Sequence, residues 1–542
     1  MSAPSATTPP ADLVVGTFSD DPPWLVAPAE LRWRIGLEGV RMRTRAEVPE
    51  LVRRRTVPPL GRLASTARHL GVPVATWALT DRRRGREVSR AGLSWRLRQA
   101  AERLGPTYIK LAQIISAGEG LFPEELVAEL KHCRDRVPPE SWRDVRTVVE
   151  EELARPLEEV FTSFERTPLA AASIAQVHAA TLVTGEDVVV KIQRPRVHEL
   201  VRRDLAMMSW LAPALVGRIP VASLANPPAL VELFADTINE ELDFRLEAEN
   251  MLDVARVLAD LGQRGFVVPR PHPELVTRRL LVMERLSGFA FDDVTGMHAA
   301  GVDTEAVVRT GMIAFLEGAM LYGVFHGDLH GGNLFVQPDG RTALLDYGIT
   351  GRLDEPGRLA FLRLLMASIT NDVHTQLAAL RDLGALPTDT DLGAVIRDLG
   401  LDQPVVDPTT MTGDELVAEL RRLVKALLGY GARLPKELML FVKNMVFLDG
   451  AIATLAPDLD LFAEIANVAA HFATTHAERL TRDIGLDPKT VELDLAGVKA
   501  GFGVAPETEA LTYRELQARR DLIRNRFAER ERTSVRRGFK PG

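Results

Sequence analysis

The sequence predicts an α+β protein with two lobes, a small β-rich lobe that carries one long helix and a larger, mainly helical lobe edged by a small β-hairpin. Three observations predict this class. Strand-like runs dominate residues 158–193 and return near 266–287, an amphipathic helical run lies between them, and after residue 303 the helical period is broken by just two short strands. A chain of 542 residues can bury a large core and form about two to four structural units.

Three segments precede the β-rich lobe. Residues 1–31 lack the charged start and apolar run of a secretory signal and are predicted to be a disordered leader. Residues 32–93 are a basic, partly helical segment interrupted by Pro and Gly. Residues 94–157 are predicted to be a helical extension, with about three helices from Ser94 onward that stop at Gly-Pro, Phe-Pro and Pro-Pro.

The first lobe is expected over residues 158–287. Its runs FTSFERTPLAAASIAQVHAATLV and DVVVKIQRP are separated by Thr-Gly-Glu, which indicates a hairpin. A long amphipathic helix is predicted to begin just after Pro227 and Pro228 and to end at Gly262, and VVPRPHPELVTRRLLVMERLSG adds two strands. The helical second lobe is expected over residues 288–480 and a C-terminal helical tail over 481–542.

Charge is unevenly distributed along the chain. The net charge of −8 gives no general signal for nucleic-acid binding. Residues 32–103 contain eighteen Arg against six acidic residues, and residues 513–540 contain ten basic against four acidic residues, which leaves −26 for the remainder. Basic ends on an acidic body suit an anionic membrane surface, where each Lys or Arg contributes about 1 kcal/mol. The alternative interpretation is a set of solvated, Arg-rich helix faces.

Cysteine and apolar content predict the compartment. Cys133 is the single cysteine, which excludes an intramolecular disulfide and fits a reducing cytoplasm. No stretch of about 18 uninterrupted apolar residues is present, and the nearest, GMIAFLEGAMLYGVF, contains Glu317. We therefore expect a cytoplasmic protein whose membrane contact is peripheral, at the inner face.

The segment FHGDLHGGNLFVQPDGRTALLDYG, residues 325–348, places several oxygen-bearing side chains on two predicted strands joined by a Pro-Asp-Gly turn. Neighbouring carboxylates are costly unless a positive group lies between them. Asn333 follows Asp328 by five positions and Asp346 follows it by eighteen, which matches the catalytic loop and metal-binding D-x-G of protein kinases. Asn333 and Asp346 are therefore candidate Mg²⁺ ligands, and Asp328 is the candidate group that orients or deprotonates an attacking hydroxyl or water.

Other features of this segment differ from the pattern of a protein kinase. His326 is expected to pack beneath the loop, and His330 to make a local hydrogen bond. Gly327 stands where protein kinases carry the Arg that senses activation-loop phosphorylation. The helical run EPGRLAFLRLLMASI resumes soon after Gly348, which argues against a peptide-docking platform.

Lys191 ends the run DVVVK and is predicted to reach the α and β phosphates of a nucleotide. Glu247 on the long helix would hold this lysine, and Asp243, four residues earlier, is predicted to share its helix face.

The usual Gly-rich loop is replaced by PLAAASIAQVH, in which Ala170, Ala171, Ala172 and Ser173 are predicted to form the turn. Alanine restricts positive φ and keeps backbone amides farther from phosphate than glycine does. We therefore expect a nucleotide to bind differently from its binding in ordinary kinases.

With these motifs the chain resembles the UbiB/ADCK/AarF family of atypical kinases. The resemblance covers about residues 95 to 475 and includes AAASIAQVH, VVVK, ELDFRLEAEN with its E-x-D at Glu241 and Asp243, HGDLHGGN, LLDYG and LGPTYIKLAQ. It implies a bilobal protein-kinase-like fold with a family-specific N-terminal helical extension. It also implies ATP (or ADP) and Mg²⁺ as cofactors, and ATPase activity coupled to isoprenoid-quinone or other lipid metabolism at membranes rather than protein phosphorylation.

The resemblance implies site residues as well. A K-x-G-Q helix folds over the cleft of this family where a protein substrate would dock, and its matching positions are Lys110 and Gln113, which would face the E-x-D acids and the nucleotide. Ala112 replaces the family's Gly, so its Cβ would lie where the helix passes close to the nucleotide, and Tyr347 replaces Phe. The expected nucleotide-binding residues are Ala170, Ala171, Ala172, Ser173, Lys191, Glu284, Lys110, Gln113, Glu241 and Asp243; the catalytic residues are Asp328, Lys191 and Glu247; the metal ligands are Asn333 and Asp346.

Two other functions stay open. A small-molecule phosphotransferase of the aminoglycoside or choline kinase type has the same loop style, but the KLAQ helix and the alanine-rich loop argue against it. A non-catalytic nucleotide-sensing scaffold is opposed by retention of Lys191 and the residues of the catalytic loop. The expected partners are an adenine nucleotide, an anionic membrane surface and quinone or lipid precursors, with no nucleic acid, and a homodimer stays an open alternative.

Overall fold

A computed structural model of the chain divides into two compact units, Met1–Gly288 with Ala343–Thr350, and Phe289–Thr342 with Gly351–Gly542. Both contain helices and antiparallel strands, which confirms the predicted two-lobed α+β class. The structure describes residues 19, 23, 24, 26–53, 57–82, 86–116, 123–133, 138–215, 227–263, 265–370, 372–401, 426, 429–432, 435–485, 494–501, 504, 505 and 507–522.

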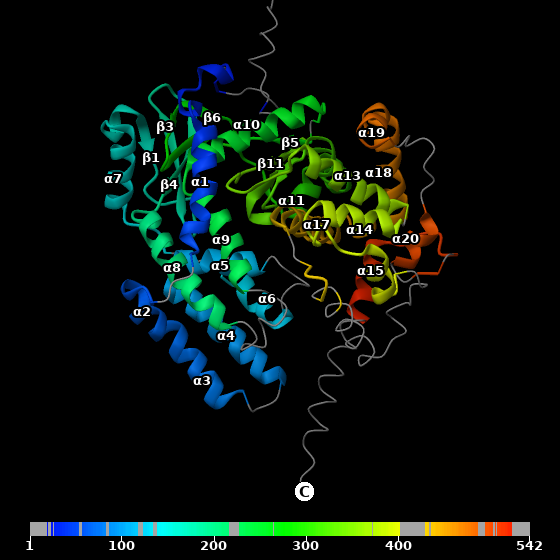
Figure 1. Ribbon diagram of the computed structural model, residues 1–542. Coiled ribbons are helices and arrows are strands. Elements are labelled where there is room, and N and C mark those ends of the chain that lie inside the picture. Colours follow the sequence, from blue (N-terminus) through cyan, green and yellow to red (C-terminus); the bar gives the residue numbers. More distant parts are fainter. Residues whose placement is uncertain are drawn as a thin grey trace, which may run out of the picture. The chain divides into compact units, whose positions relative to one another are not determined.

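The first unit is built on an antiparallel sheet with strand order β1-β3-β4-β7-β6, and β2 pairs with the beginning of β3. Figure 1 labels β1, β3, β4 and β6 of this sheet. The predicted hairpin is confirmed as β3 and β4, whose turn contains Gly185 with a φ of +104°. The strands are β1 (Phe161–Phe164), β2 (Ala170–Ala171), β3 (Ala175–Leu182), β4 (Asp187–Gln193), β5 (Phe266–Val267), β6 (Pro271–Val276) and β7 (Leu280–Glu284).

The two faces of β4 have different neighbours. Val190 and Ile192 are buried against α7 (Trp142–Leu153), which lies beside the strands in Figure 1. Because side chains alternate along a strand, Lys191 points to the opposite face, where its ammonium meets α10 (Phe244–Asp260). The sheet therefore buries an apolar face under α7 and presents a lysine to α10.

The prediction of a single helix from Pro227 to Gly262 is wrong, because the chain forms two helices there. α9 (Pro227–Glu241) stops before Asp243, whose backbone is extended and whose carboxylate accepts the N–H of Arg245 at the start of α10. Aspartate is a strong N-cap, so it begins a new helix. Asp243 and Glu247 consequently do not share one continuous helix face.

A residue within the predicted leader contacts the core of the first unit. Trp24 packs on the sheet core, 4.6 Å from the ring of His272, because an indole ring has a large apolar surface to bury; residues 1–18 lie outside the described residues. The three helices expected from Ser94 onward are confirmed as α4, α5 and α6. The helices of this part are α1 (Leu37–Leu51), α2 (Leu60–Thr66), η4 (Ala67–Gly71), α3 (Val72–Thr80), α4 (Arg86–Leu104), α5 (Pro106–Ser116), α6 (Glu124–Lys131) and α8 (Val197–Leu215).

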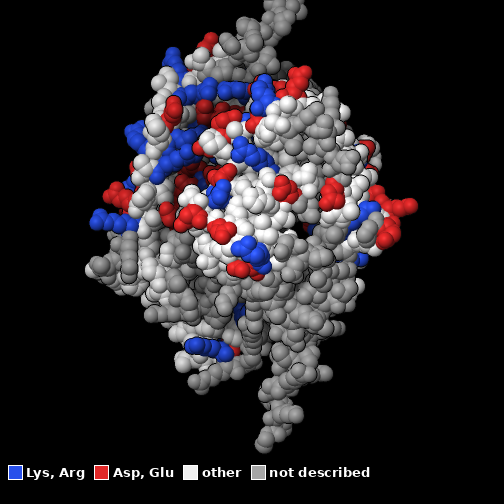
Figure 2. All heavy atoms as spheres, turned by 45° about the vertical axis from the view of Figure 1, so that its right-hand side comes forward, with Lys and Arg blue, Asp and Glu red and all other residues white. Residues whose placement is uncertain are grey.

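Arginines of the basic N-terminal segment pair with acids of the same unit. Arg34 makes two contacts with Glu249 on α10, at 2.7 and 2.8 Å, and Arg62 lies 2.5 Å from the fully buried Asp204 on α8. On the face drawn in Figure 2, basic and acidic side chains are interleaved. A share of the basic excess therefore neutralises acids inside the unit, which neither interpretation of the sequence anticipated.

Aspartates begin many helices of the second unit. Each accepts a backbone N–H from the first turn, which satisfies a donor that the helix cannot satisfy itself. Part of the acidic excess of the sequence thus has a local structural role. The capped helices are α11 (Val294–Ala299) after Asp293, α12 (Thr304–Glu317) after Asp303, α13 (Glu355–Ile369) after Asp354, α14 (Val373–Asp382) after Asp372, α15 (Leu392–Leu399) after Asp391 and α18 (Leu461–Thr475) after Asp460.

The Pro-Asp-Gly turn is confirmed within the second unit. The Gln337 N–H donates to the Arg341 carbonyl at 2.8 Å, and Gly340 has a φ of +86°. In the C-terminal tail, Tyr513 joins the core formed with α17 and α12, while residues 523–542 lie outside the described residues. The remaining elements are β8 (Phe289–Ala290), η7 (Gly318–Tyr322), β9 (Val324–His326), η8 (Gly331–Asn333), β10 (Leu334–Val336), β11 (Thr342–Leu344), β12 (Thr350–Arg352), α17 (Lys436–Leu455), α19 (Ala477–Ile484) and α20 (Leu495–Gly501).

Within the described residues, α17 is the one helix long and apolar enough to cross a membrane by length and composition. In this structure 44% of its most apolar window is buried, and Leu440, Phe441 and Asn444 are among its buried residues. One helix of this kind is weak evidence for a membrane span, because a core helix passes the same test of length and composition.

The core beneath β4 gives a stability prediction. Ile192→Ala, at a position 1% exposed, should lower the free energy of unfolding by about 2–5 kcal/mol because it leaves a cavity under α7. Val183→Ala, at 53% exposure just after β3, is the matched control and should cost less than about 0.5 kcal/mol. Urea unfolding followed by circular dichroism measures both, and equal midpoints would contradict the assignment of this core.

Candidate functional site

Lys191 and Glu247 form a buried ion pair in the first unit. Their side chains are 9% and 4% exposed, and Nζ lies 2.6 Å from Oε1. Burial by itself lowers the pKa of Lys191, but the charges of Asp346 and Glu247 outweigh it and hold that pKa above its ordinary value. Burial raises the pKa of Glu247 to about 7, repulsion from Asp346 adds to this, and Lys191 opposes both.

Asp346 brings a second carboxylate to the same lysine, with Oδ1 3.2 Å from Nζ. Its segment is fixed to α10, because the Tyr347 N–H donates to Glu247 Oε1 at 3.3 Å and Asn250 Nδ2 donates to the Tyr347 carbonyl at 2.9 Å. The Asp346 side chain remains 40% exposed. The lysine is thus held from the buried side by Glu247 and approached from the open side by Asp346.

The KLAQ helix α5 adjoins this cluster. Lys110 Nζ lies 2.8 Å from Glu241 Oε1, and both side chains are largely buried. A Cβ at Gly348 would come within 3.2 Å of Asp346 Oδ1 and 3.4 Å of Glu241 Cγ. Glycine at this position therefore lets Glu241 and Asp346 approach each other, and the Lys110–Glu241 pair lies next to the Asp346 segment.

Ala112 and Gln113 follow Lys110 on α5. Ala112 is 3% exposed and lies about 200° around the helix from Lys110. Its Cβ therefore points into the packed interior, away from Lys110, and does not narrow the space beside that lysine. Gln113 is half-buried.

The alanine-rich segment is a short strand followed by a tight turn. The Ala172 N–H donates to the Ala175 carbonyl at 2.8 Å, which leaves Ser173 and Ile174 as the turn. The prediction of a turn over Ala170–Ser173 was wrong, because the first two alanines form β2 and pair with β3. None of these described residues has a positive φ, so alanine fits the segment without strain.

Asp243 and Glu284, which were also expected to contact the nucleotide, form hydrogen bonds with other residues of the first unit. Asp243 accepts two hydrogen bonds from the Arg245 guanidinium, at 2.9 and 2.6 Å. Glu284, 8% exposed, accepts the Arg270 N–H at 3.3 Å and the hydroxyl of Ser19. Both carboxylates are thus paired within the chain itself.

Asp328 and Asn333 lie in the second unit, between β9 and β10. Asn333 Nδ2 donates to the Asp328 carbonyl at 3.2 Å. His326, 4% exposed, accepts the Asp328 N–H on Nδ1, and His330 Nδ1 accepts the Gly332 N–H, each at 3.1 Å. The supporting role expected of His326 and the local hydrogen bond expected of His330 are confirmed.

Helix α17 supplies two contacts to this loop that sequence reasoning missed. Lys443 Nζ contacts Asp328 Oδ1. Asn444, fully buried, accepts the Leu329 N–H at 3.0 Å and donates to the His326 carbonyl. A Lys-Asn pair inside the otherwise apolar run LFVKNMVFL was the available signal, because polar groups buried in a helix need partners.

A second cluster in the second unit was also missed. Glu317, 1% exposed at the end of α12, accepts hydrogen bonds from Nε2 of His471 and of His476, both at 2.7 Å. The three potential ligand atoms lie within 4.8 Å of one another. In this arrangement two imidazoles satisfy a buried carboxylate that would otherwise be costly.

The residues present fit a magnesium-bound phosphate chemically. Asp346 and Asn333 carry carboxylate and amide oxygens, the hard ligands that Mg²⁺ takes in proteins. The exposed side of Asp346 leaves room for a cation, and Lys191 beside it offers positive charge to phosphate oxygens.

Comparisons with known proteins agree with the motifs. The ABC1 atypical kinase-like domain matches residues 132–379. An uncharacterised Mycobacterium tuberculosis protein is 36% identical over 380 residues, 69% of this chain and 77% of that protein. An uncharacterised aarF domain-containing protein kinase of Arabidopsis thaliana chloroplasts is 32% identical over 394 residues, 68% of this chain and 73% of that protein. A probable protein kinase UbiB of Marinobacter nauticus is 32% identical over 376 residues, 68% of each chain.

Among solved structures, a Mycobacterium tuberculosis protein in complex with erythromycin is similar at a TM-score of 0.36 and 22% identity, over 64% of this chain and 90% of that one. The relatives above match over two thirds or more of their own length at 32–36% identity. The chain therefore belongs to the UbiB/ADCK/AarF family of atypical kinases, with the bilobal protein-kinase-like fold of that family.

Proposed function

We propose that this protein is an ATP-dependent atypical kinase or ATPase that binds ATP (or ADP) with Mg²⁺. The observation that carries the proposal is the contact of one buried lysine, Lys191, with both Glu247 and Asp346. A lysine fixed between a buried helix glutamate and the Asp of a D-x-G segment is the arrangement that kinases use to hold nucleotide phosphates.

The residues have separate roles in this proposal. Lys191 binds the α and β phosphates, and Glu247 keeps it in place. Asp346 and Asn333 would ligate Mg²⁺, which when bound neutralises charge on the phosphate oxygens. Asp328 orients or deprotonates the attacking hydroxyl or water. The remaining proposed nucleotide contacts are Ala170, Ala171, Ala172, Ser173, Glu284, Lys110, Gln113, Glu241 and Asp243.

Lys443 is an addition to the sequence-based site. Its ammonium contacts Asp328 Oδ1, so it holds that carboxylate in one orientation and places positive charge where an attacking oxygen meets a phosphate. Positive charge positioned in this way stabilises the transition state of phosphoryl transfer more than the ground state. Lys443 is therefore a positioning residue for Asp328 in this proposal.

The proposed setting is isoprenoid-quinone or other lipid metabolism, in the cytoplasm and at the inner face of a membrane. Family membership supports this setting, and one relative carries the name UbiB. A small-molecule phosphotransferase and a nucleotide-sensing scaffold are the alternatives. Turnover of ATP by the purified protein separates the first proposal from the scaffold, and transfer to soluble alcohols would favour the phosphotransferase.

Asp346→Asn should lower Mg²⁺-dependent ATP turnover about 100-fold or more, because it removes a charged metal ligand beside Lys191. The matched control is Asp339→Asn in the exposed turn of the second unit, where the carboxylate binds Arg341. Phosphate release measured at saturating Mg²⁺ distinguishes them. Unchanged turnover by Asp346→Asn would remove Asp346 from the mechanism.

Lys443→Met should lower turnover about 10- to 1000-fold while changing the Kd for ADP less than about threefold, because Lys443 acts on Asp328 and not on the nucleotide. Lys436→Met, at the first turn of the same helix, is the control. Turnover and calorimetric titration are measured on the same preparations. A loss of ADP affinity equal to the loss of turnover would contradict this role.

Ala171→Gly should change the ratio of ATP to ADP affinity, because glycine removes a Cβ from β2 and frees the backbone near the turn. Ala300→Gly, at the C-cap of α11, is the control for a general Ala-to-Gly effect. Calorimetric titration with each nucleotide gives the ratio. The same ratio in the wild type and in Ala171→Gly would count against a nucleotide contact at this loop.

A further inference from the structure

Two histidine side chains converge on one buried carboxylate oxygen in the second unit. Nε2 of His471 and Nε2 of His476 each lie 2.7 Å from Oε1 of Glu317. The three atoms that could bind a metal ion all lie within 4.8 Å of one another. Glu317 ends α12, whereas His471 lies in α18 and His476 lies between α18 and α19. Side chains 154 and 159 positions apart thus meet at one point.

The end of α18 brings the second imidazole to this point. Residues five positions apart on a continuous α-helix lie about 140° apart around its axis, so His471 and His476 would face different directions. The backbone of His476 instead leaves the helix, with φ of −120° and ψ of 13°, and α19 begins at the next residue. The two imidazole rings consequently lie 5.7 Å apart between centroids and contact the same carboxylate.

The carboxylate is enclosed, whereas one imidazole is open to solvent. The side chain of Glu317 is 2% exposed, that of His476 is 12% exposed and that of His471 is 31% exposed. A buried carboxylate is costly unless it is paired, and with neutral imidazoles the trio carries one negative charge. The trio therefore favours a cation, and the open side of His471 gives it a path from solvent and space for a water ligand.

Both imidazoles can turn a lone pair toward such a cation. In the described structure, hydrogen bonds of His471 and His476 run through Nε2 to Glu317, and neither ring uses Nδ1 to bind another described residue. The ring hydrogen can therefore move from Nε2 to Nδ1, where water accepts it. Each Nε2 then offers its lone pair to the ion, and no proton has to leave the imidazole.

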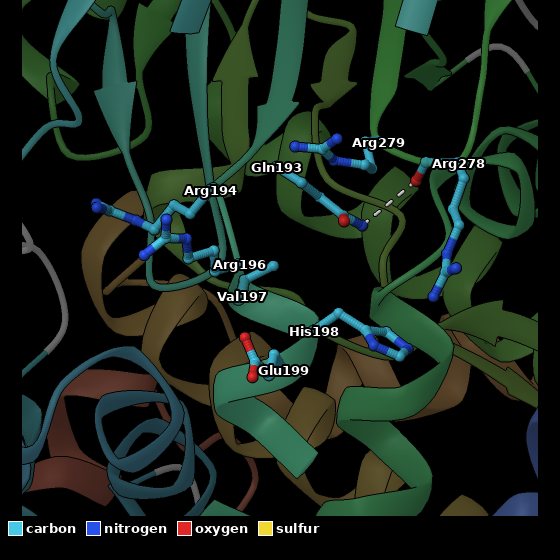
Figure 3. Close-up of a pocket in the computed structure, with 8 residues that line it drawn as sticks. All are labelled: Gln193, Arg194, Arg196, Val197, His198, Glu199, Arg278 and Arg279. Carbon is cyan, nitrogen blue, oxygen red and sulfur yellow. Dashed lines mark hydrogen bonds between the residues drawn. The ribbon is translucent and has the colours of Figure 1, made fainter. Parts of the chain in front are cut away.

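The imidazole of His198 in the first unit has different neighbours. It lines the pocket drawn in Figure 3 together with Arg278. Burial lowers the pKa of His198, and the charges of Arg278 and Arg202 lower it further. The acid in this lining, Glu199, pairs with Arg203. Positive charge repels a cation, and the described residues that line this pocket include no second imidazole, so His198 serves as a control and not as a second site.

We propose that Glu317, His471 and His476 bind one divalent transition-metal ion, with Zn²⁺ as the expected metal. Two imidazole nitrogens and one carboxylate oxygen form a donor set that Zn²⁺ takes with water as the fourth ligand. Mg²⁺ and Ca²⁺ take oxygen ligands, so the two imidazoles select against them.

The geometry needs a small adjustment to hold the ion. Bonds of about 2.0–2.1 Å to a tetrahedral Zn²⁺ place the ligand atoms roughly 3.3 Å apart. Each imidazole therefore moves roughly 0.6 Å away from Oε1 of Glu317, which rotation of the side chains supplies. Coordinate bonds then replace the two hydrogen bonds, and the ion ties the end of α12 to the junction of α18 and α19.

This inference does not rest on the proposed function. Asn333 and Asp346, the proposed Mg²⁺ ligands, do not belong to the trio. A protein that failed to bind ATP would still bind zinc at Glu317.

The test is calorimetric titration of the full chain, stripped of metal by a chelator, with zinc chloride in the presence of excess Mg²⁺. The wild type should bind zinc, and His471→Gln/His476→Gln should weaken binding at least about 100-fold, because loss of even an indirect support of a metal costs about 10- to 100-fold. Glutamine keeps an N–H donor for Glu317 but no imidazole. The matched control is His198→Gln/His374→Gln, which also removes one half-buried and one more exposed imidazole. It should change the Kd less than about threefold.

Two further readouts separate metal binding from a purely structural role of the trio. Zinc should raise the unfolding midpoint of the wild type and of the control, because a ligand that binds the folded state stabilises it. It should leave the midpoints of His471→Gln/His476→Gln and of Glu317→Gln unchanged. X-ray absorption at the zinc edge should show two imidazole ligands in the wild type.

Four results would overturn the proposal. They are no zinc binding by the wild type, equal weakening by the two double variants, a zinc shell of oxygen atoms alone, and displacement of zinc by Mg²⁺. The last two would assign the ion to oxygen ligands such as Asn333 and Asp346. Wild-type protein that binds zinc but does not turn over ATP would contradict the proposed function alone.

Discussion

The buried pair of Lys191 and Glu247 is the constraint on which the first unit depends. Neither charge is tolerated alone at 9% and 4% exposure, and removing one partner of such a pair costs about 3–5 kcal/mol. The pair therefore fixes the face of β4 relative to α10. Glu247 also accepts the Tyr347 N–H, so the same interaction that satisfies the lysine positions the segment that carries Asp346.

Ion pairs also fix the N-terminal helices to other helices of the first unit. Arg34 binds Glu249 and Arg62 binds Asp204, so helices from the start of the chain neutralise acids on α8 and α10. A basic stretch of sequence thus becomes part of the packing around the proposed nucleotide site.

In the second unit, the loop with Asp328 is held by groups remote in sequence. Asn444 bonds both the Leu329 N–H and the His326 carbonyl, and Lys443 contacts the Asp328 carboxylate. An apolar helix that satisfies a simple test for a membrane span is therefore also the support of the proposed catalytic loop. Lys443 and Asn444 hold this loop, and the composition of the helix alone does not reveal that role.

The sequence by itself determined the α+β class, the β3–β4 hairpin, the family and the pairing of Lys191 with Glu247, because period, turn residues and motif spacing are local properties. It could not place the break at Asp243, since a capping aspartate and a helical aspartate look alike until φ and ψ are known. Tertiary structure alone decided the contact of Lys443 with Asp328 and those of His471 and His476 with Glu317. These contacts join residues 115 to 159 positions apart, and no local pattern encodes which distant side chains a fold brings together.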